Sequence, residues 1–418
     1  MTNSVSTMLA AVLAREGVLE FQQRPVPAVT LAADVLLAVE GCGICGTDLH
    51  ILQSPPGHPA THGSILGHEF IGRVLETGSA VTTLRPGQRV AVAPNISCGL
   101  CAACKGGRPN HCADFTTLGI FKDGGLAPYC VVPERACHPM ADHVPFEDAI
   151  WVEVLSCVIN SVDTVKALPG ETALVLGGGP TGALHALLFA AAGATVIVSD
   201  MSDDRLDIVR AAGIAHTINP ARETLTDAVG ALAPDGAEIV VDCVGNQLDA
   251  ALDVVRTGGR ISLFGMNMHA RPAVRQNTIT RNELTVYGSY VGVNTFPRAI
   301  SILERGVIKP SSLMSAVVPL EQLTEALDLL GDSAAETAAP DAAGQADRSP
   351  RPRPATRLTA REVAVLTVVA DGATDQEVAE RLGLPPRTVT SYLTRIYAKL
   401  GVRTRTAAVR VAREHNHV

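Results

Sequence analysis

The chain has 418 residues, a net charge of −8, and a composition that is 47% hydrophobic and 18% charged. This length suits two or three domains, and the composition is typical of a soluble globular protein rather than a disordered or fibrous one. No apolar stretch is long enough to span a bilayer, and the N-terminus lacks the basic start of a signal peptide. We therefore expect a cytoplasmic protein without membrane contact.

The charge is unevenly distributed along the chain. Residues 355–418 carry ten Lys and Arg against six Asp and Glu, a net charge of +4, which leaves −12 for residues 1–354. This difference assigns any nucleic-acid contact to the C-terminal part. Just before it, residues 333–356 are rich in Ala, Pro, Asp and Arg and have no apolar period, so we expect a linker there.

Four of the ten cysteines lie in one short loop, residues 95–113, with the spacing C-x2-C-x2-C-x7-C. They are Cys98, Cys101, Cys104 and Cys112. Four thiolates brought together in this way form a closed tetrahedral set that suits structural zinc. The alternative, four unrelated buried thiols, is disfavoured because the loop is too polar to bury them.

A second set of potential ligands is dispersed over the segments GICGTDLH, GHEFIG and WVEVLSC. A catalytic zinc needs three protein ligands and an exchangeable position, and cysteine, histidine and carboxylate side chains can supply the three. Each signal is weak by itself, since a lone histidine before a glutamate is more often structural.

The segment LGGGPTG carries G-x-G-x-x-G at Gly177, Gly179 and Gly182, between an expected strand at 173–176 and an expected helix at 181–192. That context predicts a dinucleotide site, in which Pro180 and Thr181 open a helix whose N-terminus faces the pyrophosphate. A further strand is expected at 195–199. Asp200 follows it, where a carboxylate accepts hydrogen bonds from the adenosine ribose and repels a 2′-phosphate, which predicts NAD rather than NADP.

Residues 357–415 carry four helical patterns with clear ends. Thr359 with Glu362, and Thr374 with Glu377, have the spacing of capping boxes. The second helical pattern, a short turn at 383–385 and the third pattern together predict a helix-turn-helix.

Taken together, GICGTDLH, GHEFIG and the four-cysteine loop resemble the medium-chain zinc alcohol and polyol dehydrogenase family over residues 8–330. The resemblance implies an α/β fold: a GroES-like, β-rich catalytic domain at 8–160, a Rossmann NAD-binding domain with a doubly wound parallel sheet at 161–300, and a return segment to the catalytic domain at 301–332. It also implies that VDCVGN and ISLFGM line the nicotinamide side of the cofactor site.

By the same resemblance, Cys45 and His68 correspond to ligands of the catalytic zinc. Glu153 falls where polyol dehydrogenases carry a Glu-Pro-Leu segment, and it would bind this zinc directly or through water; Val154 replaces the proline. Glu69 is a candidate to exchange into the coordination sphere. Cys42 precedes the matching position and is interpreted as a packing residue.

The resemblance further implies a proton relay in which the Thr47 hydroxyl takes the substrate proton and passes it through the cofactor ribose to His50. Arg205 matches a basic residue near the adenosine ribose, although a solvated helix residue is equally consistent with the sequence. Two histidines on an expected surface loop, His58 and His62, receive no role.

The segments LTAREVAVL, DQEVAERLGLPPRTVTSYLTRIYAKLGV and RTRTAAV resemble the LuxR-type DNA-binding domain. This implies an all-α, four-helix helix-turn-helix domain at 357–418, whose third helix enters the major groove of double-stranded DNA. The candidate contacts are Arg387, Thr388, Thr390, Ser391, Arg395 and Lys399. For any of them, a solvated helix face is the alternative.

The sequence therefore predicts an NAD-dependent oxidoreductase with two zinc ions per chain, one catalytic and one structural. Its substrate would be a secondary alcohol, polyol or cyclitol, oxidised reversibly to a ketone or aldehyde, and the chain would form a homo-dimer or homo-tetramer. The alternative is a transcriptional regulator that uses a dehydrogenase scaffold to sense NAD(H) or another ligand. The full set of ligand and relay residues favours catalysis.

Overall fold

The computed structural model describes residues 6–268, 270–272, 274–336, 360–371, 373–382, 384, 389, 392–393, 396–397, 400, 402 and 405–414. The chain forms two compact units, Met1–Ala339 and Pro340–Val418. Among the described residues, no helix has the length and apolar character needed to cross a membrane.

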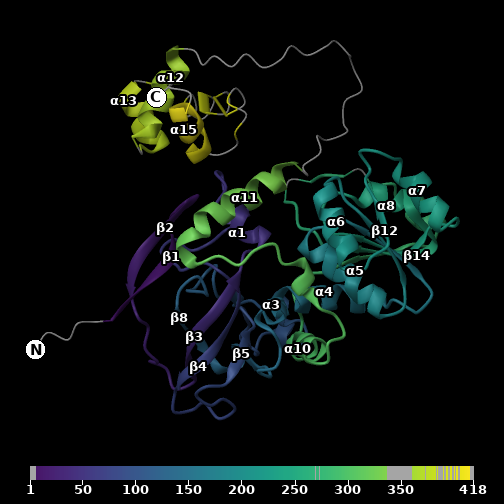
Figure 1. Cartoon of the computed structure of the whole chain (residues 1–418), viewed down its shortest axis with the longest axis horizontal. Coiled ribbons are helices and arrows are strands. Elements are labelled where there is room, and N and C mark those ends of the chain that lie inside the picture. Colours follow the sequence, from purple (N-terminus) through teal and green to yellow (C-terminus); the bar gives the residue numbers. More distant parts are fainter. Residues whose placement is uncertain are drawn as a thin grey trace, which may run out of the picture. The chain divides into compact units, whose positions relative to one another are not determined.

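The first part of unit 1 is built from antiparallel strands (Figure 1). A hairpin joins β1 (Thr7–Arg15) and β2 (Val18–Pro25). A five-stranded sheet has the order β8-β3-β4-β5-β9, with β3 (Asp34–Gly43), β4 (Glu69–Thr77), β5 (Arg89–Val92), β8 (Tyr129–Pro133) and β9 (Cys137–Pro139). Short elements connect them: α1 (Gly46–Ile51), β6 (Asn95–Ile96), α2 (Ala102–Lys105), η1 (Pro109–His111), β7 (Thr116–Thr117), η2 (Glu134–Ala136) and α3 (Phe146–Ala149).

The second part of unit 1 is a parallel sheet with the order β12-β11-β10-β13-β14-β15. Its strands are β10 (Thr172–Leu176), β11 (Thr195–Ser199), β12 (His216–Ile218), β13 (Ala237–Asp242), β14 (Val255–Leu263) and β15 (Thr285–Gly288). The helices between them are α5 (Pro180–Ala191), α6 (Asp203–Ala211), α7 (Leu225–Leu232), α8 (Leu248–Val254) and α9 (Gln276–Arg281). The central strands are continuous apolar runs because helices cover both faces of such a sheet. The predicted strand–helix–strand unit at 173–199 is confirmed to within one residue at each boundary.

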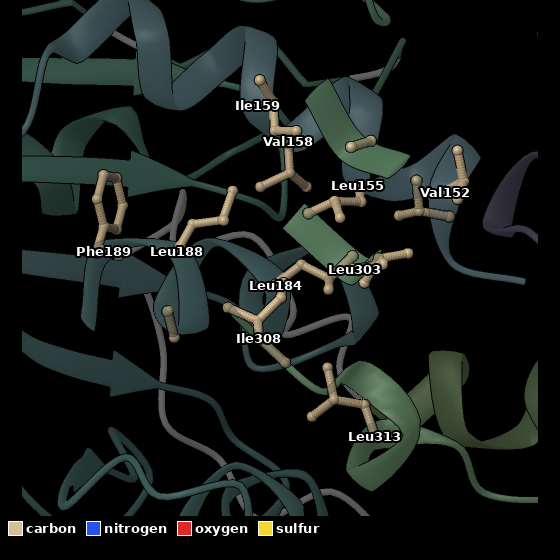
Figure 2. Close-up of a cluster of buried hydrophobic side chains, with 14 of the residues drawn as sticks. Val152, Leu155, Val158, Ile159, Leu184, Leu188, Phe189, Leu303, Ile308 and Leu313 are labelled. Carbon is tan, nitrogen blue, oxygen red and sulfur yellow. The ribbon is translucent and has the colours of Figure 1, made fainter. Parts of the chain in front are cut away.

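Helix α4 (Val152–Val165) connects the two sheets. Leu155, Val158 and Ile159 are fully buried on it, and they pack with residues of α5 and of α10 (Phe296–Glu304) (Figure 2). The same core cluster includes Ile71 from the antiparallel sheet and Val175 from the parallel sheet. The first turn of α4 is thereby held between the two parts of unit 1.

The chain returns to the antiparallel part after α10, through η3 (Pro310–Leu313), η4 (Leu320–Gln322) and α11 (Leu323–Glu336). Leu323 and Leu327 of α11 are buried in one cluster with Met8 and Leu13 of β1. Helix α11 extends through the first four residues assigned to the linker, because the Ala-rich sequence at 333–336 favours a helix. The rest of that segment, 337–356, lies outside the described residues.

Unit 2 is helical, with α12 (Ala360–Ala370), α13 (Asp375–Leu382) and α15 (Arg405–Glu414) in its described part. Its core combines buried residues of these helices with Ala373, between α12 and α13, and with three residues from the region of the predicted third helix. The members are Val365, Leu366, Val369, Ala373, Val378, Ala379, Val389, Leu393, Ile396, Ala408 and Ala412. Thr374 and Glu377 form the predicted capping box: the Thr374 backbone N–H donates to Glu377 Oε2 at 2.7 Å, and the Glu377 N–H donates to Thr374 Oγ1 at 3.3 Å. Thr359, of the other capping box, lies outside the described residues.

His185 is a fully buried histidine on α5, below the glycine-rich turn. Its Nδ1 donates to the Thr181 carbonyl at 2.8 Å, and its Nε2 has no hydrogen-bond partner in the described part of the chain. Burial lowers the pKa of His185 to about 4. The folded unit therefore keeps this ring neutral at a pH where the unfolded chain binds a proton.

Because the unfolded chain binds this proton and the folded unit does not, unit 1 becomes less stable as the pH falls. We predict that the free energy of unfolding of unit 1 decreases between pH 7 and pH 5 by about 2 kcal/mol through His185, since the unfolded imidazole protonates near pH 6.5. Urea unfolding, followed through the fluorescence of the only tryptophan, Trp151, measures it. His185→Leu should lose this part of the pH dependence, while the exposed control His62→Leu should keep it; equal slopes in both variants would contradict the assignment.

Candidate active site

A cavity of about 1620 Å³ lies in unit 1 between the antiparallel part and the C-terminal ends of the parallel strands. Its lining comes from both sides: from α1, the start of β4 and the first turn of α4, and from the loops that follow β10, β11, β13, β14 and β15. Ligands of parallel α/β sheets bind at these carboxyl ends. The residues predicted for the catalytic zinc and for the dinucleotide thus lie on the wall of one cavity.

Cys45, His68 and Glu69 form the first cluster on this wall, and their candidate ligand atoms lie within 4.8 Å of one another. Cys45 is the N-cap of α1, and the other two stand where β4 begins, so secondary-structure ends position all three. His68 and Glu69 are buried. A thiol, an imidazole and a carboxylate converging in this way match a catalytic zinc site with an open position.

The electrostatics of the cluster also fit a cation. Burial raises the pKa of the Cys45 thiol well above its usual value, and Glu69 and Asp48 raise it further. Burial raises the pKa of Glu69 to about 7. Burial by itself lowers the pKa of His68, but the carboxylates of Asp48, Glu69 and Glu153 raise it. A divalent cation would stabilise the thiolate and carboxylate forms that burial now disfavours.

Asp48 supports the cluster from inside α1. Its Oδ2 accepts the Cys45 backbone N–H at 2.9 Å, and its Oδ1 lies 3.7 Å from His68 Nδ1. Asp48 Oδ1 and His68 Nδ1 are both buried, and neither has a hydrogen-bond partner among the residues that the structure describes. A carboxylate beside one ring nitrogen is the usual partner of a metal-binding histidine, and it leaves Nε2 to face the ion.

Glu153 lies in the first turn of α4, on the wall of the same cavity. Its carboxylate influences the pKa values of His68 and Glu69, and its Oε1 accepts a hydrogen bond from the Cys157 thiol at 3.5 Å. It is outside the set of ligand atoms that converge within 4.8 Å, whereas Glu69 is inside it. Its role as a zinc ligand therefore remains a prediction.

Thr47 and His50, the residues of the expected proton relay, line the cavity on α1. Partial burial lowers the pKa of His50, and His58 lowers it further. His58 also lines the cavity, and its Nδ1 donates to the Pro59 carbonyl at 2.8 Å. His58 could not be selected from the sequence, because it lies in a loop without a motif.

The four-cysteine loop forms the second cluster, with the candidate ligand atoms of Cys98, Cys101, Cys104 and Cys112 within 4.8 Å of one another. Backbone N–H groups point at the sulfur atoms: Cys98 N–H donates to Cys112 Sγ at 3.2 Å, and Cys101 N–H to Cys98 Sγ at 3.3 Å. Backbone N–H groups of Cys104 and Ala113 lower the pKa of Cys101 to about 6. The pKa of Cys98 is lowered too, by the N–H groups of Leu100 and Cys101, whereas burial raises that of Cys104 to about 11. The convergence of four free cysteines fits the predicted structural zinc, because a bound cation would stabilise all four thiolates.

The glycine-rich turn joins β10 to α5 as predicted. Gly177 has φ +102°, which favours glycine, and a Cβ on Gly182 would lie 1.8 Å from the Gly177 carbonyl oxygen. Gly179 is the N-cap of α5 and, with Gly177, Pro180 and Thr181, lines the cavity. The backbone can thus approach a pyrophosphate at the start of a twelve-residue helix.

Asp200 lies after β11 on the cavity wall and is largely buried. Its Oδ2 accepts the Gly178 N–H at 2.7 Å, and its Oδ1 accepts the Ser202 N–H at 2.8 Å. Arg205, also on the wall, places Nη1 3.6 Å from Asp200 Oδ2. The contact holds the Arg205 side chain beside Asp200 on the cavity wall, and its role at the adenosine ribose remains a prediction.

Two further sets of residues line the cavity, one expected from the sequence and one not. One comes from the two segments expected at the nicotinamide: Cys243, Val244 and Asn246 of VDCVGN, and Phe264, Gly265 and Met266 of ISLFGM. Their place beside the nicotinamide remains a prediction. Ser289, Tyr290 and Val291, after β15, were missed, because nothing in the sequence marks them. The six candidate DNA contacts, Arg387, Thr388, Thr390, Ser391, Arg395 and Lys399, lie outside the described residues.

Comparison with known families matches three parts of the chain. Residues 32–142 match the alcohol dehydrogenase GroES-like domain, residues 180–305 the zinc-binding dehydrogenase domain, and residues 356–412 the bacterial regulatory proteins of the luxR family. Sorbitol dehydrogenase of Bacillus subtilis is 31% identical over 336 residues, covering 78% of this chain and 95% of that protein. A probable D-xylulose reductase A of Aspergillus fumigatus is 30% identical over 348 residues, covering 78% and 95%.

Solved structures agree. An alcohol dehydrogenase of Escherichia coli CFT073, RspB, complexed with NADH, has a TM-score of 0.73 and 29% identity over 78% of this chain and 96% of its own. A protein described as a zinc-binding dehydrogenase from Sinorhizobium meliloti 1021, bound to NADP, has a TM-score of 0.73 and 31% identity over 81% and 97%. The predicted fold class is confirmed, as is an alcohol dehydrogenase that uses zinc and a nicotinamide cofactor. The chain belongs to the zinc-binding medium-chain alcohol dehydrogenases, and its C-terminal domain belongs to the luxR family of bacterial regulatory proteins.

Proposed function

We propose that the chain oxidises a secondary alcohol, polyol or cyclitol with NAD, using a catalytic zinc at Cys45 and His68. The observation that carries the proposal is the convergence of Cys45, His68 and Glu69 on the wall of the cavity that also holds the glycine-rich turn. Relatives named sorbitol dehydrogenase and D-xylulose reductase support a substrate with several hydroxyl groups.

The bound zinc supplies Lewis acidity that lowers the pKa of an alcohol, and the nicotinamide supplies the hydride acceptor. Cys45 and His68 would hold the ion, and Glu69 or Glu153 would complete its protein ligands. Thr47 would accept the substrate's hydroxyl proton at Oγ1, and His50 would release it to water. The lowered pKa of His50 keeps its ring neutral, and hence able to take up a proton, at neutral pH.

A second zinc at the four-cysteine loop would be structural, because four thiolates leave no open position. Asp200 would select NAD: its largely buried carboxylate stands at the end of β11, where a ribose hydroxyl would be a partner and a 2′-phosphate would be repelled.

Unit 2 would bind double-stranded DNA through its third helix, which the luxR family match supports. Unlike the candidate DNA contacts, Arg405 has a structural role. It forms an ion pair with Asp375 and donates to the Ala373 carbonyl, and these contacts hold α15 against the start of α13. A regulator that senses NADH through unit 1 remains the second candidate, because one chain carries both domain types.

The zinc site yields the first prediction for catalysis. Cys45→Ser should abolish turnover and lower the zinc content by about one ion per chain, because an alcohol side chain is a poor replacement for a thiolate. NADH should still bind, as measured by its fluorescence. Cys137→Ser, a buried cysteine on β9, is the matched control and should keep zinc and turnover. Full activity of Cys45→Ser would refute the mechanism.

The residue expected at the adenosine ribose, Asp200, yields a second prediction for catalysis. Asp200→Ala should narrow the preference for NAD over NADP by at least about tenfold in kcat/KM, since the variant no longer repels the 2′-phosphate. The exposed control Asp204→Ala, on α6, should leave the preference unchanged. Steady-state kinetics with both cofactors measure it, and an unchanged ratio in Asp200→Ala would remove this role from Asp200.

The C-terminal domain yields a separate prediction, about DNA binding. Affinity selection from random duplexes, followed by fluorescence anisotropy, should give a selected site that binds the full chain with an affinity falling steeply as salt rises. Replacing Arg387 and Arg395 by alanine should weaken binding at least about tenfold. An affinity that changes with NADH would favour the regulator. Failure to bind any selected duplex at low salt would remove DNA as a partner.

A further inference from the structure

Residues 289–295 form a strap between β15 and α10, and its first part lies on the wall of the cavity. Ser289, Tyr290 and Val291 line the wall. The Ser289 N–H donates to the Leu263 carbonyl at 3.0 Å, which keeps the strap beside the end of β14. It thus continues the row of carboxyl strand ends at which a dinucleotide is received.

One side of the strap contacts the four-cysteine loop. Asn110 Nδ2 donates to the Tyr290 carbonyl at 3.0 Å. The ring of Tyr290 lies 5.9 Å from that of His111 and 6.5 Å from that of Phe115. Asn110 and His111 are the two residues just before Cys112, so the same turn of chain places a sulfur ligand and the contact to the strap.

The other side of the strap is tied to α4. Asn160 Nδ2 donates to the Val291 carbonyl at 2.8 Å, and Thr295 Oγ1 donates to the Ser156 carbonyl at 2.7 Å. Val291 has φ +45° and Asn294 φ +55°, backbone conformations that cost free energy for residues with side chains. Because these backbone conformations are unfavourable by themselves, the strap depends on its contacts with the four-cysteine loop and α4 to keep its position.

We propose that the four-cysteine loop and the dinucleotide pocket are energetically coupled through the Asn110–Tyr290 contact, so that metal on the thiolates and NADH in the cavity strengthen each other's binding. A metal-ordered loop holds Asn110 and His111 in place, and these position the strap before the cofactor arrives. Coupling of two binding equilibria is reciprocal. The inference rests on the proposed structural zinc.

The test measures both directions of the coupling on the full chain. A chelator and an alkylating reagent are added together, and mass spectrometry follows the alkylation rate of the peptide containing Cys98–Cys112, separately from that of Cys45. In the unmodified protein, NADH should slow alkylation of the four-cysteine peptide. Asn110→Ala should lose this protection and should raise the Kd of NADH, measured by fluorescence, about three- to tenfold, as expected for one lost hydrogen bond.

Arg108→Ala is the matched control, because Arg108 is exposed on the same loop and should change neither quantity. Asn110→Asp, similar in shape but without the donor, should behave like Asn110→Ala. Zinc content and Trp151 fluorescence show that each variant is folded and loaded. Protection that persists in both Asn110 variants, or an unchanged Kd, would overturn the coupling. A single zinc per chain that survives loss of the four cysteines would overturn it too, while leaving the catalytic proposal intact.

Discussion

Ionisable side chains are buried together where α1 and β4 begin, and this burial determines what the site can bind. Cys45, His68 and Glu69 converge within 4.8 Å, and Asp48 and Glu153 act on them electrostatically from nearby. Without a cation, burial opposes ionisation of the thiol and the carboxylate. Two polar atoms, Asp48 Oδ1 and His68 Nδ1, lie 3.7 Å apart and form no hydrogen bond with the described residues. Such a cluster is costly unless an ion compensates it, so its presence indicates function rather than stability.

The packing of unit 1 places the cluster of Cys45, His68 and Glu69 beside the carboxyl ends of the parallel strands. Helix α4 packs against both sheets through one apolar core and carries Glu153 in its first turn. Helix α11 returns to β1 and closes the antiparallel part. The ligand cluster and the glycine-rich turn therefore face one cavity, which is what transfer of a hydride between an alcohol and a nicotinamide requires.

Local patterns in the sequence predicted local structure well. The glycine-rich turn, its flanking strands, and the four-cysteine loop are specified by residues close together in the chain, and each is where the sequence placed it. Contacts between distant segments had no such signal. Three features depend on how the parts of unit 1 pack. Glu69, and not Glu153, converges with Cys45 and His68. His58 lies on the cavity wall, and Asn110 donates a hydrogen bond to the Tyr290 carbonyl.

In the proposed mechanism, one zinc ion binds Cys45 and His68 inside the cavity that would receive NAD. An anomalous-difference map collected at the zinc edge from crystals of the full chain with NADH tests it most directly. We expect a zinc peak about 2.3 Å from Cys45 Sγ and about 2.1 Å from a His68 nitrogen, with the nicotinamide ring beside it. A map with no peak there, or with these two side chains turned away from each other, would contradict it.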